Sequence, residues 1–179
     1  MINQPFEPEL TDELLIKEYK NNNTGSLQKL LLRYHKQLFN FIYRMTKNTA
    51  LSEDILQEVF LRVIKNIKRF VPERESSFRQ WLYQIAINLC RDNFKRRQEF
   101  SSMGLESISK LPQTNPYEIE DLIAGLPKEQ KEVVLLKVYS GLTFREIADT
   151  LKCPINTAIS RMHYALKSLR GKMKIYDSV

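Results

Sequence analysis

The sequence predicts an all-α protein of two small helical domains joined by a flexible linker, with a helix-turn-helix in the C-terminal domain. Apolar residues recur at steps of three and four along most of the 179 residues, as they do on one face of a helix. Glycine and proline number only 5 and 7, which suits long helices better than a turn-rich sheet. One aperiodic stretch, residues 98–116, separates the two helical parts.

Four helices are expected before that stretch. Residues 11–20 and 26–47 form the first two, separated by the helix-breaking run Asn-Asn-Asn-Thr-Gly. Residues 51–68 have the clearest amphipathic pattern, and residues 78–97 form a fourth helix that ends in basic residues. The apolar stripes expected on these helices are Leu14, Leu15 and Tyr19; Leu27, Leu30, Leu31, Tyr34, Leu38, Phe41, Ile42 and Met45; Leu51, Ile55, Leu56, Val59, Phe60, Val63, Ile64 and Ile67; and Phe78, Trp81, Leu82, Ile85, Leu89 and Phe94.

The linker follows from composition, because residues 98–116 lose the helical period and contain four Ser, one Gly and two Pro. A fully extended chain of this length reaches roughly 60 Å. One turn of duplex DNA is about 35 Å. Modules at residues 1–97 and 117–179 could therefore bind separate turns of a duplex.

The C-terminal part begins with helices at residues 117–125 and 127–139, and Gly141 is a natural stop after the second. Thr143-Phe-Arg-Glu146 matches a capping box, in which each end residue bonds the backbone of the other. The helix that this box begins continues to Leu151.

A tight turn at Lys152-Cys153 and a longer helix from Pro154 complete a helix-turn-helix. The apolar stripe expected on the last helix is Ile155, Ala158, Met162, Ala165, Leu166, Leu169 and Met173. Its other side carries short polar residues near the N-terminus, which suit base edges, while Arg161 and Lys167 can reach phosphates. An ordinary helical hairpin is the alternative.

The charge distribution favours a nucleic-acid partner or an anionic membrane. The net charge is +7 and the pI about 9.4. Residues 152–174 contain six Lys or Arg and no acid, and residues 62–69 contain four and none. Between residues 117 and 151 the acids outnumber the bases. Such segregation produces basic faces, although solvated helix surfaces would give the same pattern.

No catalytic or metal site is expected. Cys90 and Cys153 are far apart, which fits a reducing compartment, and neither has metal-ligand spacing with His35 or His163. The sequence lacks a glycine-rich phosphate loop and a Ser/His/Asp arrangement, so neither an enzyme nor a cofactor is predicted. The N-terminus does not resemble a signal peptide and no run is long enough to span a membrane, so we expect a cytoplasmic protein.

Three segments together resemble the extracytoplasmic-function (ECF) sigma factors of bacterial RNA polymerase. Residues 54–62, Asp-Ile-Leu-Gln-Glu-Val-Phe-Leu-Arg, resemble the segment that grips the clamp helices of the β′ subunit, and residues 78–92 resemble the −10 segment. Leu126-Pro127, residues 141–148 and residues 153–162 resemble the −35 domain. The segments cover nearly the whole chain in the family's order.

The resemblance implies a sigma factor that binds core RNA polymerase through the β′ clamp helices and the β flap, melts the −10 element and reads the −35 element. Residues 72–77 and Asn88 would hold a flipped −10 base. The implied core polymerase contacts are Asp54, Gln57, Glu58 and Leu61. The implied −10 contacts are Glu73, Arg74, Ser76, Ser77, Asn88, Arg91, Lys95 and Arg96. The implied −35 contacts are Asn156, Thr157, Ile159, Ser160, Arg161, His163, Tyr164 and Lys167.

The resemblance also implies an anti-sigma factor as a partner, often membrane-anchored in this family. The last helix departs from the family pattern, because Asn-Thr-Ala-Ile at residues 156–159 replaces Gly-Thr-Val and a basic residue. A helix-turn-helix regulator that does not bind core polymerase is the competing interpretation. It leaves the acidic and amide edge of residues 54–58 unexplained.

Overall fold

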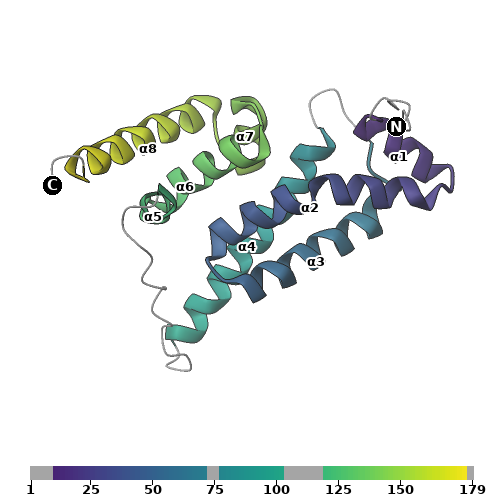
Figure 1. Ribbon diagram of the computed structural model, residues 1–179, viewed down its shortest axis with the longest axis horizontal. Coiled ribbons are helices and arrows are strands. Elements are labelled where there is room, and N and C mark those ends of the chain that lie inside the picture. Colours follow the sequence, from purple (N-terminus) through teal and green to yellow (C-terminus); the bar gives the residue numbers. More distant parts are fainter. Residues whose placement is uncertain (1–9, 72–76, 103–118, 177–179) are drawn as a thin grey trace, which may run out of the picture.

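A computed structural model describes residues 10–71, 77–102 and 119–176 of the chain, and every element in those ranges is helical. Figure 1 shows two groups of helices that pack side by side. This confirms the prediction of an all-α protein with two helical domains. None of the helices in these ranges combines the length and the apolarity of a membrane span.

The N-terminal domain contains four helices: α1 (Asp12–Lys20), α2 (Thr24–Thr46), α3 (Thr49–Asn66) and α4 (Phe78–Ser102). The α2 helix contacts α1, α3 and α4, and α3 also packs on α4. Side chains cap two of them at the positions where the sequence changes from polar to apolar. The Thr11 hydroxyl accepts a hydrogen bond from the Leu14 amide (3.4 Å), and the side-chain oxygen Oδ1 of Asn48 accepts one from the Leu51 amide (2.9 Å).

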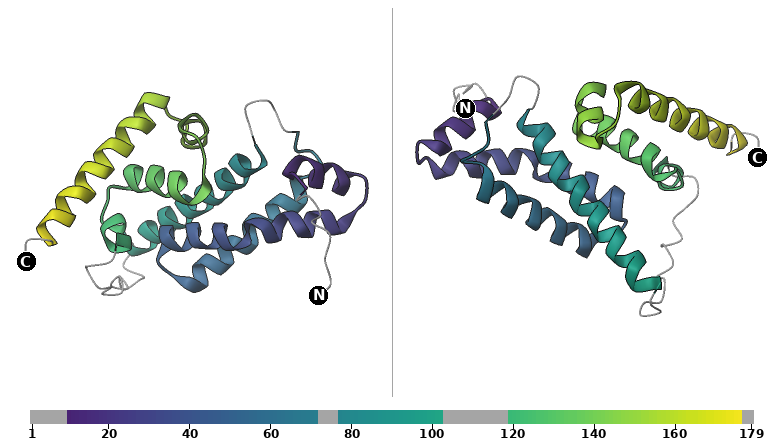
Figure 2. Two further views of the ribbon diagram at one scale, coloured as in Figure 1. Left: turned by 45° about the horizontal axis from the view of Figure 1, so that its top comes forward. Right: turned by 180° about the vertical axis from the view of Figure 1, so that it is seen from behind.

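The C-terminal domain contains α5 (Ile119–Ala124), α6 (Lys128–Leu135), the π-helical turn η1 (Leu136–Ser140), α7 (Phe144–Leu151) and α8 (Ile155–Tyr176). Gly141 ends η1 with φ at 69°, in the left-handed region that glycine adopts without strain. The α8 helix packs on α5, α6 and α7. In Figures 1 and 2, α8 lies on the outer side of the molecule, away from α3.

One apolar core runs through both domains. In the N-terminal domain it contains the edge-to-face pairs Tyr34–Phe78 and Phe41–Tyr83, with ring centroids 5.6 and 5.2 Å apart. The same cluster continues into the C-terminal domain through buried residues of α6, η1, α7 and the turn between η1 and α7. These residues are Val133, Leu135, Leu136, Leu142, Ile147, Ala148 and Leu151. A smaller cluster beneath α8 consists of Leu122, Leu126, Val134, Ala165 and Leu169.

The helices differ from the expected ones mainly at their ends. The α2 helix begins at Thr24, so the break covers only residues 21–23. The α4 helix runs to Ser102, five residues past the predicted end at Arg97. The predicted helix at residues 127–139 ends in a π turn.

Some apolar residues that were assigned to buried stripes are exposed, and those assignments are wrong. Leu14, Ile64, Ile155, Leu166 and Met173 are 46, 43, 43, 39 and 45% exposed. Each lies at the margin of its stripe. At such a position, burial depends on a neighbouring helix that the local pattern does not specify.

Candidate interfaces for protein and nucleic acid

The outer face of α3 carries the four residues that were predicted to contact core polymerase. The helix packs on α2 and α4 through its apolar side, and the predicted residues lie on the opposite side at steps of three and four. Asp54 and Gln57 are exposed, and Leu61 is 48% exposed. The Glu58 carboxylate accepts a hydrogen bond from Arg62 Nε at 2.8 Å.

Ile64 adds to this face and was missed because it was assigned to the buried stripe. It is 43% exposed and lies three residues after Leu61. Leu61 and Ile64 are therefore exposed aliphatic neighbours beside an acidic and amide edge. An apolar centre with a polar rim is typical of a protein-binding surface.

A ridge on α4 brings together several of the predicted −10 contacts. The predicted contacts Asn88, Arg91 and Lys95 lie on one side of the helix with Trp81, which was assigned to the apolar stripe. Asn88, Lys95 and Arg96 are exposed. The half-buried Trp81 ring stacks on Phe70, with centroids 4.7 Å apart. The ridge thus combines an amide, an aromatic edge and cations.

Ser77 lies at the start of α4. Its hydroxyl accepts a hydrogen bond from the Gln80 amide (3.1 Å) and donates one to Glu146 Oε1 of α7 (3.2 Å). The predicted contacts Glu73, Arg74 and Ser76 lie outside the described residues.

Arg91 is paired with an acid of the C-terminal domain. Its Nε and Nη2 donate to Oε1 and Oε2 of Glu132 at 2.8 and 2.6 Å. The Glu132 side chain is 1% exposed and the Arg91 side chain 29%. The hydrogen bonds to Glu132 raise the pKa of Arg91, so its charge is firmly held. In this arrangement the guanidinium edge that would face a phosphate is occupied.

The helix-turn-helix prediction is confirmed in its local geometry. The Thr143 hydroxyl accepts from the Glu146 amide at 3.3 Å, and Glu146 Oε2 accepts from the Thr143 amide at 2.8 Å. Lys152 ends α7 with φ at 54°, and the turn leads directly into α8. The cap fixes where α7 begins, and α7 in turn supports α8.

The polar side of α8 carries the predicted −35 contacts. Six of them are exposed: Asn156, Ile159, Ser160, His163, Tyr164 and Lys167. Thr157 and Arg161 are half-buried beside them. The six exposed side chains face away from α5, α6 and α7, which pack on the other side of α8.

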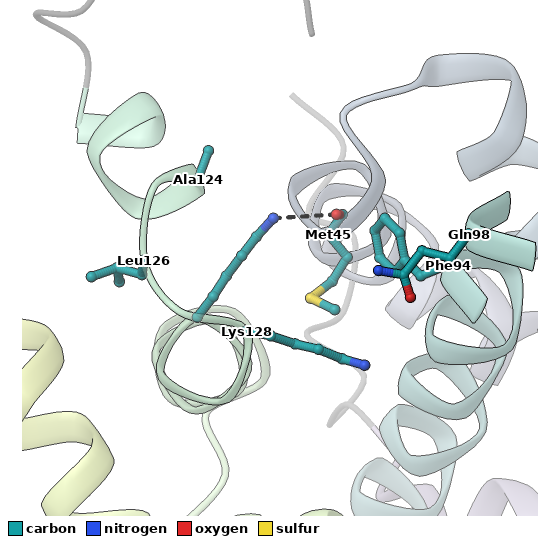
Figure 3. Close-up of a pocket in the computed structure, with 7 residues that line it drawn as sticks. Met45, Phe94, Gln98, Ala124, Leu126 and Lys128 are labelled. Carbon is teal, nitrogen blue, oxygen red and sulfur yellow. Dashed lines mark hydrogen bonds between the residues drawn. The ribbon is translucent and has the colours of Figure 1, made fainter. Parts of the chain in front are cut away.

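A pocket of about 310 Å³ lies between the two domains (Figure 3). Its wall includes Met45, Phe94 and Leu126, with Lys128 and Lys131 at its side. Lys131 Nζ donates to the carbonyl oxygen of Met45 at 3.3 Å, the dashed line in Figure 3. Burial lowers the pKa of Lys131, and the nearby Lys47 lowers it further.

Among the residues that the structure describes, no group of three or more His, Cys, Asp or Glu side chains could hold a metal ion. The Cys90 thiol is buried, and burial raises its pKa to about 12. Cys153 is half-buried.

Two sequence profiles match the chain in succession. Sigma-70 region 2 matches residues 30–100, and Sigma-70 region 4 matches residues 117–169. The ECF RNA polymerase sigma factor SigW of Bacillus subtilis is 27% identical over 179 residues, which cover 89% of this chain and 95% of SigW. The ECF RNA polymerase sigma-E factor of Escherichia coli is 25% identical over 186 residues, which cover 93% and 96% of the two chains.

Solved structures share the fold. CnrH in complex with the cytosolic domain of CnrY matches with a TM-score of 0.70 and 20% identity, over 92% of this chain and 97% of that chain. The sigma factor RpoE of Bartonella quintana, in complex with the anti-sigma factor NepR, matches with the same TM-score and identity, over 83% and 96%. With both region profiles in the family's order and relatives aligned along most of their length, the chain belongs to the ECF sigma factors of the sigma-70 family.

Proposed function

We propose that this sigma factor binds core RNA polymerase through the outer face of α3, engages the −10 element through the ridge of α4 and reads the −35 element through α8. The domains that do this are residues 1–97 and 117–179, joined by the predicted linker at residues 98–116, of which α4 takes up the first five residues. The observation that carries the proposal is the order of the two region matches, each of which covers a helix with an exposed polar face.

The α3 face suits a protein partner because none of its side chains is needed inside the N-terminal domain. Asp54, Gln57 and Glu58 present acid and amide groups, while Leu61 presents apolar surface that can be buried on binding. The resemblance assigns this face to the β′ clamp helices.

The α4 ridge suits single-stranded DNA. Exposed Lys95 and Arg96 can follow a phosphate backbone, and an aromatic such as Trp81 can support an unstacked base. Asn88 can bond the edge of a base that has left the duplex. These properties support a role in opening the −10 element.

The α8 helix suits the major groove of duplex DNA, as the second helix of a helix-turn-helix does. Asn156 and Ser160 lie near its N-terminus, where base edges come within reach. Arg161 and Lys167 lie farther along and can bind phosphates. A protein with these three faces acts in the cytoplasm as a transcription factor and not as a catalyst.

Run-off transcription with purified core polymerase tests the function. Wild-type protein should direct transcripts from specific genomic fragments, which a helix-turn-helix regulator without polymerase contact would not do. The double substitution Gln57→Ala and Glu58→Ala should weaken core binding by roughly 1–3 kcal/mol if these are central contacts. Its fold should persist, because it removes a single exposed ion pair, worth about 0.3–0.5 kcal/mol.

The matched control removes the same two side-chain types from exposed positions on other helices, as Glu13→Ala and Gln28→Ala. The control should bind core polymerase like the wild type. Equal core affinity of the α3 variant and the control would contradict the assignment of this face.

We also propose that an anti-sigma factor binds the free protein. The pocket between the domains supports this, because the half-buried Phe94 lines it beside Lys128 and Lys131. An apolar side chain with an acidic neighbour would match that chemistry. RpoE of Bartonella quintana, which shares the fold, is solved in complex with such a factor. Affinity purification from uninduced cells should recover one, and repeated recovery of polymerase alone would count against it.

A further inference from the structure

Glu132 occupies an unusual position for an acid. It begins a run of five consecutive buried residues, Glu132 to Leu136, which cannot all lie on one side of a helix. The α6–η1 segment is therefore covered from more than one side, and the second cover is α2 and α4 of the other domain. A buried carboxylate is costly unless it is paired, and both Glu132 oxygens accept from Arg91 across this boundary.

The pairing has the geometry that an arginine uses for a phosphate. A guanidinium presents two parallel N–H groups, which bind either two carboxylate oxygens or two phosphate oxygens. The distances of 2.8 and 2.6 Å are those of a charge-assisted bidentate pair. Arg91 cannot present this edge to Glu132 and to DNA at once.

We propose that Glu132 is an internal substitute for a DNA phosphate, which keeps Arg91 of the free sigma factor off the −10 strand until the two domains separate. The inference rests on the proposed role of Arg91 in −10 binding. It adds a regulatory device, since the C-terminal domain competes with DNA for the α4 ridge.

Other contacts close the same boundary. Ser77, a second predicted −10 contact, donates to Glu146, and Tyr83 donates to the carbonyl oxygen of Tyr139 at 3.1 Å. Arg44 pairs with Glu120 and lies over the Tyr139 ring, 4.2 Å from its centroid. The boundary thus combines these polar contacts with the apolar cluster that continues through both domains, and the polar contacts are the part that separation can exchange for water or a phosphate.

When the two domains separate, Arg91 and Glu132 each gain a new partner, so neither charged group is left unpaired. Once the domains part, Glu132 gains water, and Arg91 gains a phosphate when DNA is present. Polymerase binding to the exposed α3 face does not require the boundary to open first, because α3 packs only within its own domain among the major contacts. The Arg91–Glu132 pair is therefore a latch: it restrains DNA binding by the free protein while leaving the polymerase-binding face accessible.

The test measures DNA binding by the free, full-length protein. The probe is a 5′-fluorescein single-stranded oligonucleotide of 12 mixed-sequence nucleotides, followed by anisotropy across a salt series. Glu132→Gln keeps the shape but removes the charge, and should bind about tenfold more tightly, as expected when one charge-assisted contact moves to DNA. Its salt slope should be steeper by about 0.7, one added phosphate contact on a single strand.

Two further variants separate the latch from a general charge effect. Glu53→Gln removes one negative charge from an exposed position on α3, which packs on α2 and α4, and should bind like the wild type. Arg91→Ala combined with Glu132→Gln should lose the tenfold gain. If Glu53→Gln gained as much as Glu132→Gln, or if the double variant kept the gain, the inference would be overturned.

Small-angle X-ray scattering reports the opening itself. Glu132→Gln should increase the radius of gyration. The exchange Arg91→Glu with Glu132→Arg should return the radius of gyration to the wild-type value, and this variant should not show the tenfold gain in DNA affinity. Unchanged scattering and unchanged affinity for Glu132→Gln would refute the latch. Opening without a gain in affinity would overturn the inference through Arg91, whereas run-off transcription by the wild type tests the sigma function independently.

Discussion

Ile159 gives the sharpest prediction about promoter sequence. It is 44% exposed on the polar side of α8, between Asn156 and His163, where the family commonly has a basic residue. An aliphatic side chain at this position cannot bond a base edge, but it can bury the C5-methyl group of a thymine, which lies in the major groove. We expect one thymine of the −35 element to be read by this contact.

The perturbation is the removal of that methyl group by deoxyuridine, one thymine at a time. Burying one such group is worth about 0.8 kcal/mol, which corresponds to roughly fourfold in affinity. Ile159→Ala should lose a similar amount and should no longer distinguish thymine from uracil. Because Ile159 is exposed, the substitution should leave the fold intact.

The assay is competition binding of the holoenzyme to promoter duplexes identified by run-off transcription. Val138→Ala, which trims an aliphatic residue that is 59% exposed on η1, serves as the control and should keep the uracil penalty. A flat uracil scan across the −35 element would refute the reasoning. An unchanged penalty in Ile159→Ala would refute it as well.

Three other predictions concern individual side chains. Arg161→Ala should weaken −35 binding similarly for all sequences and make the salt slope shallower by about 0.9; a change of sequence preference at constant slope would contradict a phosphate contact. Burial raises the pKa of Cys90 to about 12, so at pH 8 its thiol stays protonated and iodoacetamide should modify Cys153 first, as peptide mass spectrometry can measure. Thr143→Ala should cost about 1 kcal/mol through the lost cap, or roughly 2–4 °C in Tm for a chain of this size; Thr143→Ser should retain most of it, and equal melting of the two variants would exclude the cap as the cause.

Much of the fold was predictable because helix signals are local. The capping box at residues 143–146 and the stop at Gly141 depend only on neighbouring residues, and both are present in the structure. The exposure of Ile64 and Ile155 was not predictable, because the apolar period shows that a helix has a buried side but not how wide that side is. The π turn η1 also had no signal in the sequence, because a π turn widens the helical turn by one residue without requiring a particular residue type.

The sequence predicted which residues lie on exposed functional surfaces, but it did not predict how the two domains pack against each other. Asn88 and Lys95 are exposed as a polar ridge requires, and their DNA contacts remain predictions. The pairing of Arg91 with Glu132 depends on how two domains meet, which no local pattern encodes. The run of consecutive apolar residues from Val133 to Leu136, directly after Glu132, was the available signal, because such a run cannot all lie on one side of a helix.

The core that continues through both domains bears on how long the free protein survives in a cell. Separating the domains exposes apolar residues of that core, such as Val133, Leu136 and Leu142, to water. Proteases cleave in proportion to the population of opened molecules when opening and closing are fast. The closed form and the polymerase-bound form would both resist degradation, while an open, unbound molecule would be removed. The Arg91–Glu132 pair would then set the protein's turnover rate, so that Glu132→Gln shortens its half-life in cells that lack spare polymerase.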